Sequence, residues 1–282
     1  MAMLLRVAYE GTDFHGFARQ LAPEGTASPR TVQGELEATL ARIYKQPIVT
    51  RAASRTDAGV HARGQLVAFD PPFTIPARGL LLGLASELPR DLIAIAGWEQ
   101  PEHEGVAIEP RRQNLGKHYR YRIRSAPLRD PLRDRYEWHF PRPLDPVAMQ
   151  AAAPRFVGRF DFAGFRAADC QAGSTIRRIR AVEVGVELDG SGPADPGRLE
   201  PPPRNIVIDV RGDAFLKNMV RIMVGTLVAI GRGQFGPERI DEVLASGDRA
   251  RAGATAPARG LELVEVLWPE TWPPPEHGHD DE

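Results

Sequence analysis

The order of strand-like and helix-like segments is the feature that most constrains the fold of this chain. Alternating or β-branched runs and helical periodicities follow one another as strand, helix, strand, strand, helix, strand. The same order occurs in both halves, without close sequence similarity between them. The elements expected in the first half are a strand at 4–11, a helix at 31–45, strands at 48–53 and 64–69, a helix at 77–87 and a strand at 92–98. Those expected in the second half are a strand at 117–125, a helix at 145–157, strands at 176–188 and 205–211, a helix at 215–231 and a strand at 261–268.

Two βαββαβ units predict an α+β fold of two ferredoxin-like halves. Their mainly antiparallel sheets would join and leave an active-site cleft at the seam, where ligands commonly bind. We predict an N-terminal half at 1–107 and a C-terminal half at 108–268, with the boundary near 105–110. The Gly/Pro-rich stretch at 189–203 predicts an exposed loop, and the acidic tail at 269–282 is expected to be disordered.

The composition is that of a globular protein, with 42% hydrophobic and 26% charged residues. No run approaches the roughly 18 apolar residues that a membrane span needs, and the first ten residues lack the layout of a secretory signal. We therefore expect a cytoplasmic protein that does not interact with membranes. Cys170 is the single cysteine and the histidines are scattered, so the sequence suggests neither a disulfide nor a metal site.

The charge is unevenly distributed along the chain. The formal net charge is -1, but the tail at 269–282 holds five acids and no Lys or Arg, so the preceding residues carry +4. The segment 111–135 is the most basic, and clustering of this kind fits contacts to nucleic-acid phosphates. A solvated basic face is the alternative interpretation. The basic residues of this segment are Arg111, Arg112, Lys117, Arg120, Arg122, Arg124, Arg129, Arg133 and Arg135.

The most informative stretch for chemistry is a polar turn at 54–62, between two strand-like runs. Loops positioned by strands commonly carry functional residues. The structural interpretation is a turn in which Asp57 accepts local backbone hydrogen bonds and Gly59 takes a positive φ.

The surrounding sequence, ASRTDAGVHARGQLVAF, resembles the catalytic stretch of the bacterial tRNA pseudouridine synthase A family. Four further motifs follow in the family's order and spacing, and the similarity spans about residues 4–268. These motifs are KHYRY at 117–121, FAGFR at 162–166, Phe215 with Met219, Val220, Arg221 and Gly225, and the stretch 256–263.

The resemblance implies an isomerase that converts uridine to pseudouridine at positions 38–40 of the tRNA anticodon arm. It implies Asp57 as the nucleophile and a homodimer that grips one tRNA. A carboxylate can add covalently to the base or the sugar and leave again, so no metal, redox or nucleotide cofactor is expected. Whether Asp57 attacks the uracil ring or the ribose C1′ stays open.

Two more catalytic candidates follow from the resemblance. Tyr119 matches an active-site tyrosine that can stack on the flipped base and serve proton transfer, with core packing as the alternative. Arg221 lies in an expected helix that is apolar almost all round, so it should be buried or nearly so and need an anionic partner. The resemblance supplies Asp57 as that partner, and the pairing would keep the carboxylate ionised.

Tyr119 is also a candidate for substrate binding, together with three further side chains, Arg55, His61 and Arg111. Arg55, two residues before Asp57, could fill the space that a flipped base leaves or hold a phosphate, and an ordinary surface arginine is the alternative. His61 could touch RNA or be structural. Arg111 ends a stretch that corresponds to a motif of the family.

The sequence departs from the family pattern at Ser54, at His15–Ala18 and at Ile108–Arg111. These departures bear on the choice of substrate, so a paralogue acting at other uridines is an alternative. A non-catalytic RNA-binding or RNA-folding module is another, but pure binding needs no carboxylate facing phosphates, and Asp57 is present. An unrelated aspartate-dependent hydrolase is disfavoured because the chain lacks a Gly-rich phosphate motif and a His/Asp cluster.

Overall fold

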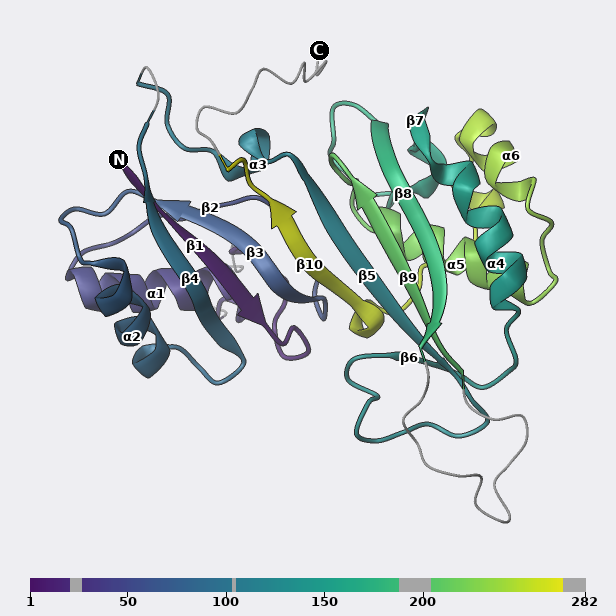
Figure 1. Ribbon diagram of the computed structural model, residues 1–282, viewed down its shortest axis with the longest axis horizontal. Helices are drawn as coiled ribbons and strands as arrows, with labels where there is room; N and C mark the ends of the chain where they lie inside the picture. The colour runs from purple at the N-terminus through teal and green to yellow at the C-terminus, as the bar shows by residue number, and fades with distance from the viewer. Residues whose placement is uncertain (21–26, 103–104, 188–203, 271–282) are drawn as a thin grey trace. The chain divides into compact units, whose positions relative to one another are not determined.

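The computed structural model describes residues 1–20, 27–102, 105–187 and 204–270 (Figure 1). The fold is mixed α+β with a large, mostly antiparallel sheet. The loop predicted at 189–203, and the predicted acidic tail apart from its first two residues, lie outside the described residues. Among the described helices, none has the length and apolar character needed to cross a membrane. The chain forms two compact units, one of Met1–Lys117 with the segment from Leu263 onward, the other of His118–Glu262.

The first unit has the expected order of strands and helices. Its strands are ordered β4-β1-β3-β10, and β1 pairs antiparallel with both β3 and β4, with Leu5 opposite Val67 on one side and Gly97 on the other. Figure 1 shows α1 and α2 against this part of the sheet. The elements are β1 (Ala2–Tyr9), α1 (Val32–Tyr44), β2 (Arg51–Ala52), β3 (His61–Phe69), α2 (Ala77–Glu87), β4 (Leu92–Gln100), α3 (Pro110–Gln113) and most of β10 (Leu261–Leu267).

Helix α1 forms where the sequence predicts it. Thr31 caps its start, since its hydroxyl oxygen accepts a hydrogen bond from the Gly34 amide at 3.2 Å. The helix buries the side chains of Val32, Leu36, Leu40 and Tyr44, as the 3.6-residue period predicts. It ends before Pro47, because Lys45 takes the left-handed conformation at φ 59°.

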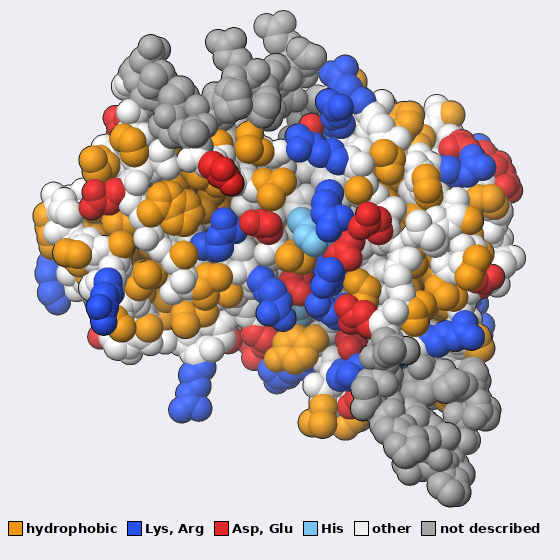
Figure 2. Space-filling model, in the orientation of Figure 1, with side chains coloured by type: hydrophobic (Ala, Val, Ile, Leu, Met, Phe, Trp, Pro, Cys, Tyr) orange, Lys and Arg blue, Asp and Glu red, His pale blue; other side chains and the backbone are white. Residues whose placement is uncertain are grey.

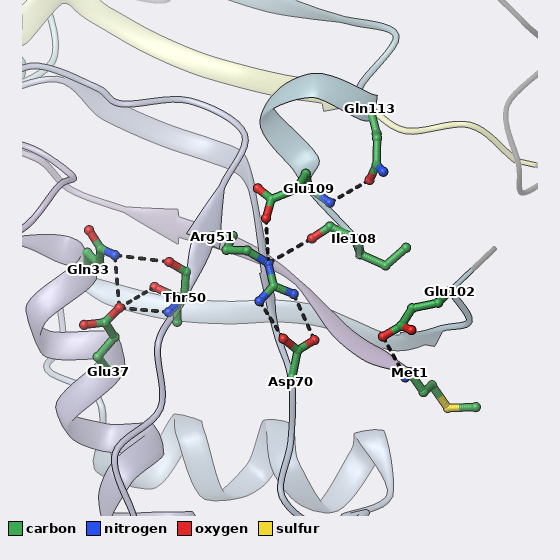
Figure 3. A network of polar contacts seen from close by, with 10 residues as sticks. All are labelled: Met1, Gln33, Glu37, Thr50, Arg51, Asp70, Glu102, Ile108, Glu109 and Gln113. Carbon is green, nitrogen blue, oxygen red and sulfur yellow. Dashed lines mark hydrogen bonds and ion pairs between the residues drawn. The ribbon is translucent and has the colours of Figure 1, made fainter. Parts of the chain in front are cut away.

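The strand expected at 48–53 is much shorter in the structure. Arg51 and Ala52 form the two-residue strand β2 that pairs with β3, and the Ala53 amide adds one hydrogen bond to the Leu66 carbonyl at 2.9 Å. The Thr50 amide and hydroxyl both donate to the Glu37 carboxylate of α1, at 2.9 Å each, so Thr50 is held by a side chain and not by a neighbouring strand (Figure 3). The next strand begins three residues earlier than expected, at His61.

In the second unit the strands are ordered β5-β9-β8-β7, and the short β6 pairs parallel to β5. The β8 and β9 strands form a long antiparallel pair, with Val184 opposite Ile208. Helix α4 packs against β8, α5 packs against α4, and α6 contacts β7 (Figure 1). The elements are β5 (Gly116–Ser125), β6 (Trp138–Phe140), α4 (Pro146–Ala152), β7 (Gly158–Asp161), β8 (Ile176–Glu187), β9 (Arg204–Gly212), α5 (Met219–Gly231) and α6 (Arg239–Ser246), with short 3-10 turns between them.

Two helices of the second unit are shorter than expected. Helix α5 begins at Met219 and not at 215, because Asn218 has a left-handed backbone at φ 62° and residues before it form a turn. Helix α4 ends at Ala152 and continues as a 3-10 turn, in which Pro154 cannot donate the amide hydrogen bond of an α-helix.

The two units do not follow the predicted boundary near 105–110. The first runs on to Lys117, and the chain returns to it at Leu263, so β10 belongs mostly to the first unit and not to the predicted half at 108–268. Strand β10 lies next to β3, where a Cβ built on Gly64 would be 2.5 Å from the Val264 carbonyl oxygen. The periodicity of a strand depends only on its own residues. It therefore does not predict which distant sheet the strand joins.

Candidate active site

Asp57 lies in the turn between β2 and β3, and its side chain is half-buried. The turn closes on itself, since the Val60 amide donates to the Asp57 carbonyl at 3.2 Å. Gly59 has φ 77°, as the turn interpretation predicted. The hydroxyls of Tyr9 and Thr56 share a buried hydrogen bond of 2.7 Å, which attaches the residue before Asp57 to β1.

A second segment, Phe14–Phe17, brackets this turn, and we call it the strap. The Phe17 amide donates to the Thr56 carbonyl at 3.0 Å, and the Gly59 amide donates to the Phe14 carbonyl at 3.3 Å. The first bond is made by the residue just before Asp57. The second bond is made by Gly59, two residues after Asp57. The main chain on both sides of the carboxylate is therefore fixed by the same four residues.

Only a glycine fits at the centre of the strap. Gly16 has φ 95°, and a Cβ built on it would lie 3.0 Å from the Thr56 carbonyl oxygen and 3.3 Å from the Ala58 amide nitrogen. Both the backbone conformation and the space exclude a larger side chain. The residues of the strap were noted in the sequence only as a departure from the family pattern, and the positive φ of Gly16 is the signal that identifies their role.

His61 is buried, and its position supports the structural interpretation. Its Nδ1 accepts a hydrogen bond from the Gly11 amide at 3.0 Å, and the Glu10 carboxylate lies 3.4 Å from the same nitrogen. Gln65, fully buried on the same strand, donates from its side-chain amide to the Ser54 carbonyl at 2.6 Å. Both side chains of β3 hold the backbone near the Asp57 turn.

Arg55 and Arg111 are exposed, and neither side chain makes a hydrogen bond or ion pair within the described part of the chain. Arg111 lies on α3, which Arg51 anchors from β2. The Arg51 guanidinium donates to the Ile108 carbonyl at 2.9 Å and to both carboxylate oxygens of Asp70, at 2.6 and 2.9 Å (Figure 3). Two exposed cationic side chains therefore extend from segments whose backbone is held by hydrogen bonds.

Tyr119 and Tyr121 lie on the buried face of β5, as the alternation predicted, but their surroundings differ. The Tyr119 ring packs edge-on against Phe215, with 5.1 Å between ring centroids. The Tyr121 hydroxyl donates to the Pro257 carbonyl at 2.7 Å, and burial raises the pKa of Tyr121 well above its usual range. Tyr121 is therefore a structural donor, which leaves Tyr119 as the candidate for chemistry.

Arg221 is half-buried, whereas every other residue of α5 is buried. Its Nε donates to the Ala256 carbonyl at 2.7 Å, and its Nη1 donates to the Asn218 side-chain oxygen at 2.8 Å. The sequence predicted a buried or nearly buried side chain, whereas Arg221 is partly exposed. These acceptors orient the guanidinium, whose permanent positive charge suits contact with an anion.

The basic segment is more neutralised than its sequence suggests. Asp209 accepts a bidentate pair of hydrogen bonds from Arg120, at 3.0 and 3.1 Å, and a further one from His118, while Arg122 forms a 2.6 Å ion pair with Glu262. Figure 2 shows blue and red side chains interleaved over β5 and β9, not a uniformly basic surface. Strand β5 is accordingly a weaker phosphate-binding surface than the count of arginines predicts.

Across the described residues, no group of three or more His, Cys, Asp or Glu side chains could hold a metal ion. Cys170 is a free cysteine of intermediate exposure. The chemically distinctive feature of the first unit is a carboxylate on a turn whose backbone is fixed on both sides. Such a group suits covalent or general acid–base chemistry that needs one well-placed oxygen.

Comparison with known proteins decides the family. A chain named tRNA pseudouridine synthase A from Pelobacter propionicus is 43% identical over 265 residues, covering 94% of this chain and 98% of that protein. Proteins of the same name from Geotalea uraniireducens and Myxococcus xanthus are each 41% identical, covering 94% of this chain and 98% and 91% of their own lengths. The chain belongs to the tRNA pseudouridine synthase A family.

A family profile described as tRNA pseudouridine synthase also matches residues 152–269. This match covers Arg221, while the turn of Asp57 is covered by the full-length relatives of the tRNA pseudouridine synthase A family. Among solved structures, an archaeal box H/ACA sRNP Nop10-Cbf5 complex contains a chain with a TM-score of 0.30 and 12% identity, covering 80% of this chain and 44% of that one. That likeness is too weak to add to the assignment.

Proposed function

We propose that this protein isomerises uridine to pseudouridine at positions 38–40 of the tRNA anticodon arm, with Asp57 as the nucleophile. The observation that carries the proposal is the bracketed turn, because two hydrogen bonds from the strap fix the backbone before and after a half-buried carboxylate. Membership of a family whose named members are tRNA pseudouridine synthases supports the reaction and the substrate.

The reaction needs a carboxylate of this kind. The bond between uracil N1 and ribose C1′ breaks, the uracil turns, and a bond from C5 to C1′ forms. The C5 proton leaves and N1 gains a proton, so no electrons are gained or lost and no redox cofactor is required. A carboxylate such as Asp57 can hold one fragment covalently while the other turns, and then leave.

Tyr119 and Arg221 complete the proposed catalytic set. An aromatic ring at Tyr119 would stack on the flipped uracil, and its hydroxyl would serve proton transfer. Arg221 is the proposed cation for Asp57, because a guanidinium held by the Ala256 carbonyl and the Asn218 side-chain oxygen is oriented for charge-assisted hydrogen bonds. Arg55 and Arg111 are the proposed contacts to RNA phosphates, whereas His61 would act through the backbone of the Asp57 turn.

The remaining parts of the proposal concern the whole protein. The βαββαβ order in the first unit supports a ferredoxin-like half, with a second such half in the rest of the chain. A homodimer would let one subunit hold the tRNA body while the other modifies the anticodon arm. We place this activity in the cytoplasm, and without a metal or nucleotide cofactor.

The decisive experiment uses tRNA from cells that lack this modification. Pseudouridine is mapped before and after incubation with the protein, and Asp57→Asn serves as the inactive control. New pseudouridine at positions 38–40 with the wild type alone supports the proposal. Modification confined to other uridines would indicate a paralogue with another target, and binding without any modification would indicate an RNA-binding module.

A further inference from the structure

We propose that Arg30 is a positioning residue for Asp57: it fixes the strap, and the strap fixes the turn that carries the carboxylate. Arg30 precedes α1 and is distant in sequence from the turn. The inference rests on the proposed function only in its expected effect on catalysis, because the structural effect can be measured separately.

The guanidinium of Arg30 is held on several sides. It lies over the Phe14 ring, with 4.1 Å between its central carbon and the ring centroid, a cation–π arrangement. It donates to both carboxylate oxygens of Asp91, at 2.7 and 2.8 Å, and its Nε donates to Glu35 at 3.1 Å. The planar fork of an arginine can make these contacts at once, and a lysine cannot.

The main chain connects the same region to the strap. The His15 amide donates to the Arg30 carbonyl at 2.9 Å, and the amides of Val32 and Gln33 donate to the Gly16 and Phe17 carbonyls at 3.2 and 2.9 Å. The strap is therefore attached to the start of α1 along its length. Its first residue, Phe14, is the one that the guanidinium also covers.

The strap then transmits this placement to the turn. The carbonyl of Phe14 accepts from the amide of Gly59, and the amide of Phe17 donates to the carbonyl of Thr56. A shift of Phe14 would move its carbonyl away from Gly59, two residues from Asp57. Misplacement of a reacting group by about 1 Å can cost on the order of a hundredfold in rate.

A role for Arg30 in binding RNA phosphate is the rival interpretation. Its Nε and both terminal nitrogens already donate to carboxylates, so its charge is balanced within the protein. The hydrogen bond from Arg30 lowers the pKa of Asp91, which keeps that carboxylate ionised at neutral pH and the anchor intact. An arginine paired in this way fits a structural role better than a contact to RNA phosphate.

The test compares Arg30→Met and Arg30→Lys with a control, Arg42→Met. Arg42 lies on α1 and pairs with Glu87 at 3.1 Å, away from the strap. With the modification-deficient tRNA, we expect kcat to fall between about tenfold and about a hundredfold in Arg30→Met, with KM within about twofold of wild type. Arg30→Lys should recover only part of the loss, and Arg42→Met should match the wild type.

Hydrogen exchange gives a readout that does not depend on the reaction. The Gly59 amide should exchange faster in Arg30→Met than in the wild type or Arg42→Met, because its acceptor on Phe14 is no longer fixed. An unchanged Gly59 exchange rate overturns the inference, and so does a raised KM with unchanged kcat. If the wild type forms no pseudouridine, the proposed function fails while the exchange result still decides the role of Arg30. Should Arg30→Met not fold, Asp91→Ala removes both acceptors of the anchor and should show the same loss of kcat and the same faster exchange of the Gly59 amide.

Discussion

Arg221 and Ala256 exchange two hydrogen bonds: the Arg221 Nε donates to the Ala256 carbonyl at 2.7 Å, and the Ala256 amide donates to the Arg221 carbonyl at 3.1 Å. The first bond orients the guanidinium and the second ties the helix to the segment before β10. Asn218 adds a third constraint, because its side-chain oxygen accepts from Nη1. The guanidinium is therefore oriented within the second unit itself.

Two replacements of Arg221 should distinguish the effect of its charge from the effect of its planar shape. Arg221→Lys keeps a cation but loses the bond from Nε and the planar fork, so we expect a clear loss of kcat. Arg221→Met removes the charge and should lose more activity. If Arg221 is the cation for Asp57, the stability loss of Arg221→Met should shrink when Asp57→Asn is added, as thermal melts of the four proteins would reveal. Simple additivity would instead favour Arg221 as a phosphate contact.

Asp57→Asn should abolish pseudouridine formation and leave the fold nearly unchanged. The turn is fixed by backbone bonds to Phe14 and Phe17, which do not involve the carboxylate. We expect a melting temperature and a tRNA affinity close to those of the wild type, measured beside a pseudouridine assay. Turnover by Asp57→Asn above background would contradict the nucleophile assignment.

Gly16→Ala should reduce both stability and activity. The added Cβ would stand 3.0 Å from the Thr56 carbonyl oxygen at φ 95°, so backbone strain of about 1–3 kcal/mol is expected, and the turn would shift. Gly233→Ala is the matched control, since Gly233 has φ 69° but no atom within 4 Å of the added Cβ. It should lose some stability and keep full activity. Equal activity of the two variants would show that the strap does not position the turn.

The Asp209 cluster should make stability depend on pH in the acid range. Burial raises the pKa of Asp209, but the hydrogen bonds from His118 and Arg120 outweigh it and hold the pKa at about 2. A lowered pKa contributes stability above the unfolded value near 4, which is lost as pH falls toward 2. The contribution is on the order of 2 kcal/mol. Denaturation of the wild type and Asp209→Asn should differ at pH 7 and converge near pH 2. A constant difference would contradict the pairing.

Binding of tRNA should weaken steeply with salt, but through fewer arginines than the basic segment contains. Arg55→Ala and Arg111→Ala should each reduce the salt slope by about 0.7–0.9, because each removes one phosphate contact. Arg120→Ala should leave the slope unchanged, since Arg120 is paired with Asp209. If all three variants reduce the salt slope equally, β5 is a phosphate-binding strand after all.

Local sequence patterns were sufficient to predict much of the fold and the position of the Asp57 turn. The 3.6-residue period and the Thr31 cap located α1, and alternation placed Tyr119 and Tyr121 on one face of β5. Most failures arose where distant residues decide the outcome. Glu37 replaces a strand partner at Thr50, and acids far along the chain neutralise Arg120 and Arg122. The late start of α5 has a local cause, the left-handed backbone of Asn218. The strap was missed as a support because its bonds to the Asp57 turn span about 40 residues of sequence.

The membership of β10 in the first unit also governs when that unit can be completed. Residues from Leu263 onward follow the whole of the second unit in the chain, so they are synthesised after it. Until then the edge of β3 that β10 covers stays open, and an open strand edge is prone to pair with other chains. The Asp57 turn leads directly into β3, so a nascent or truncated chain ending before Leu263 would carry the turn on an unfinished sheet. Competence for catalysis would then require that β10 has been synthesised and has paired with β3.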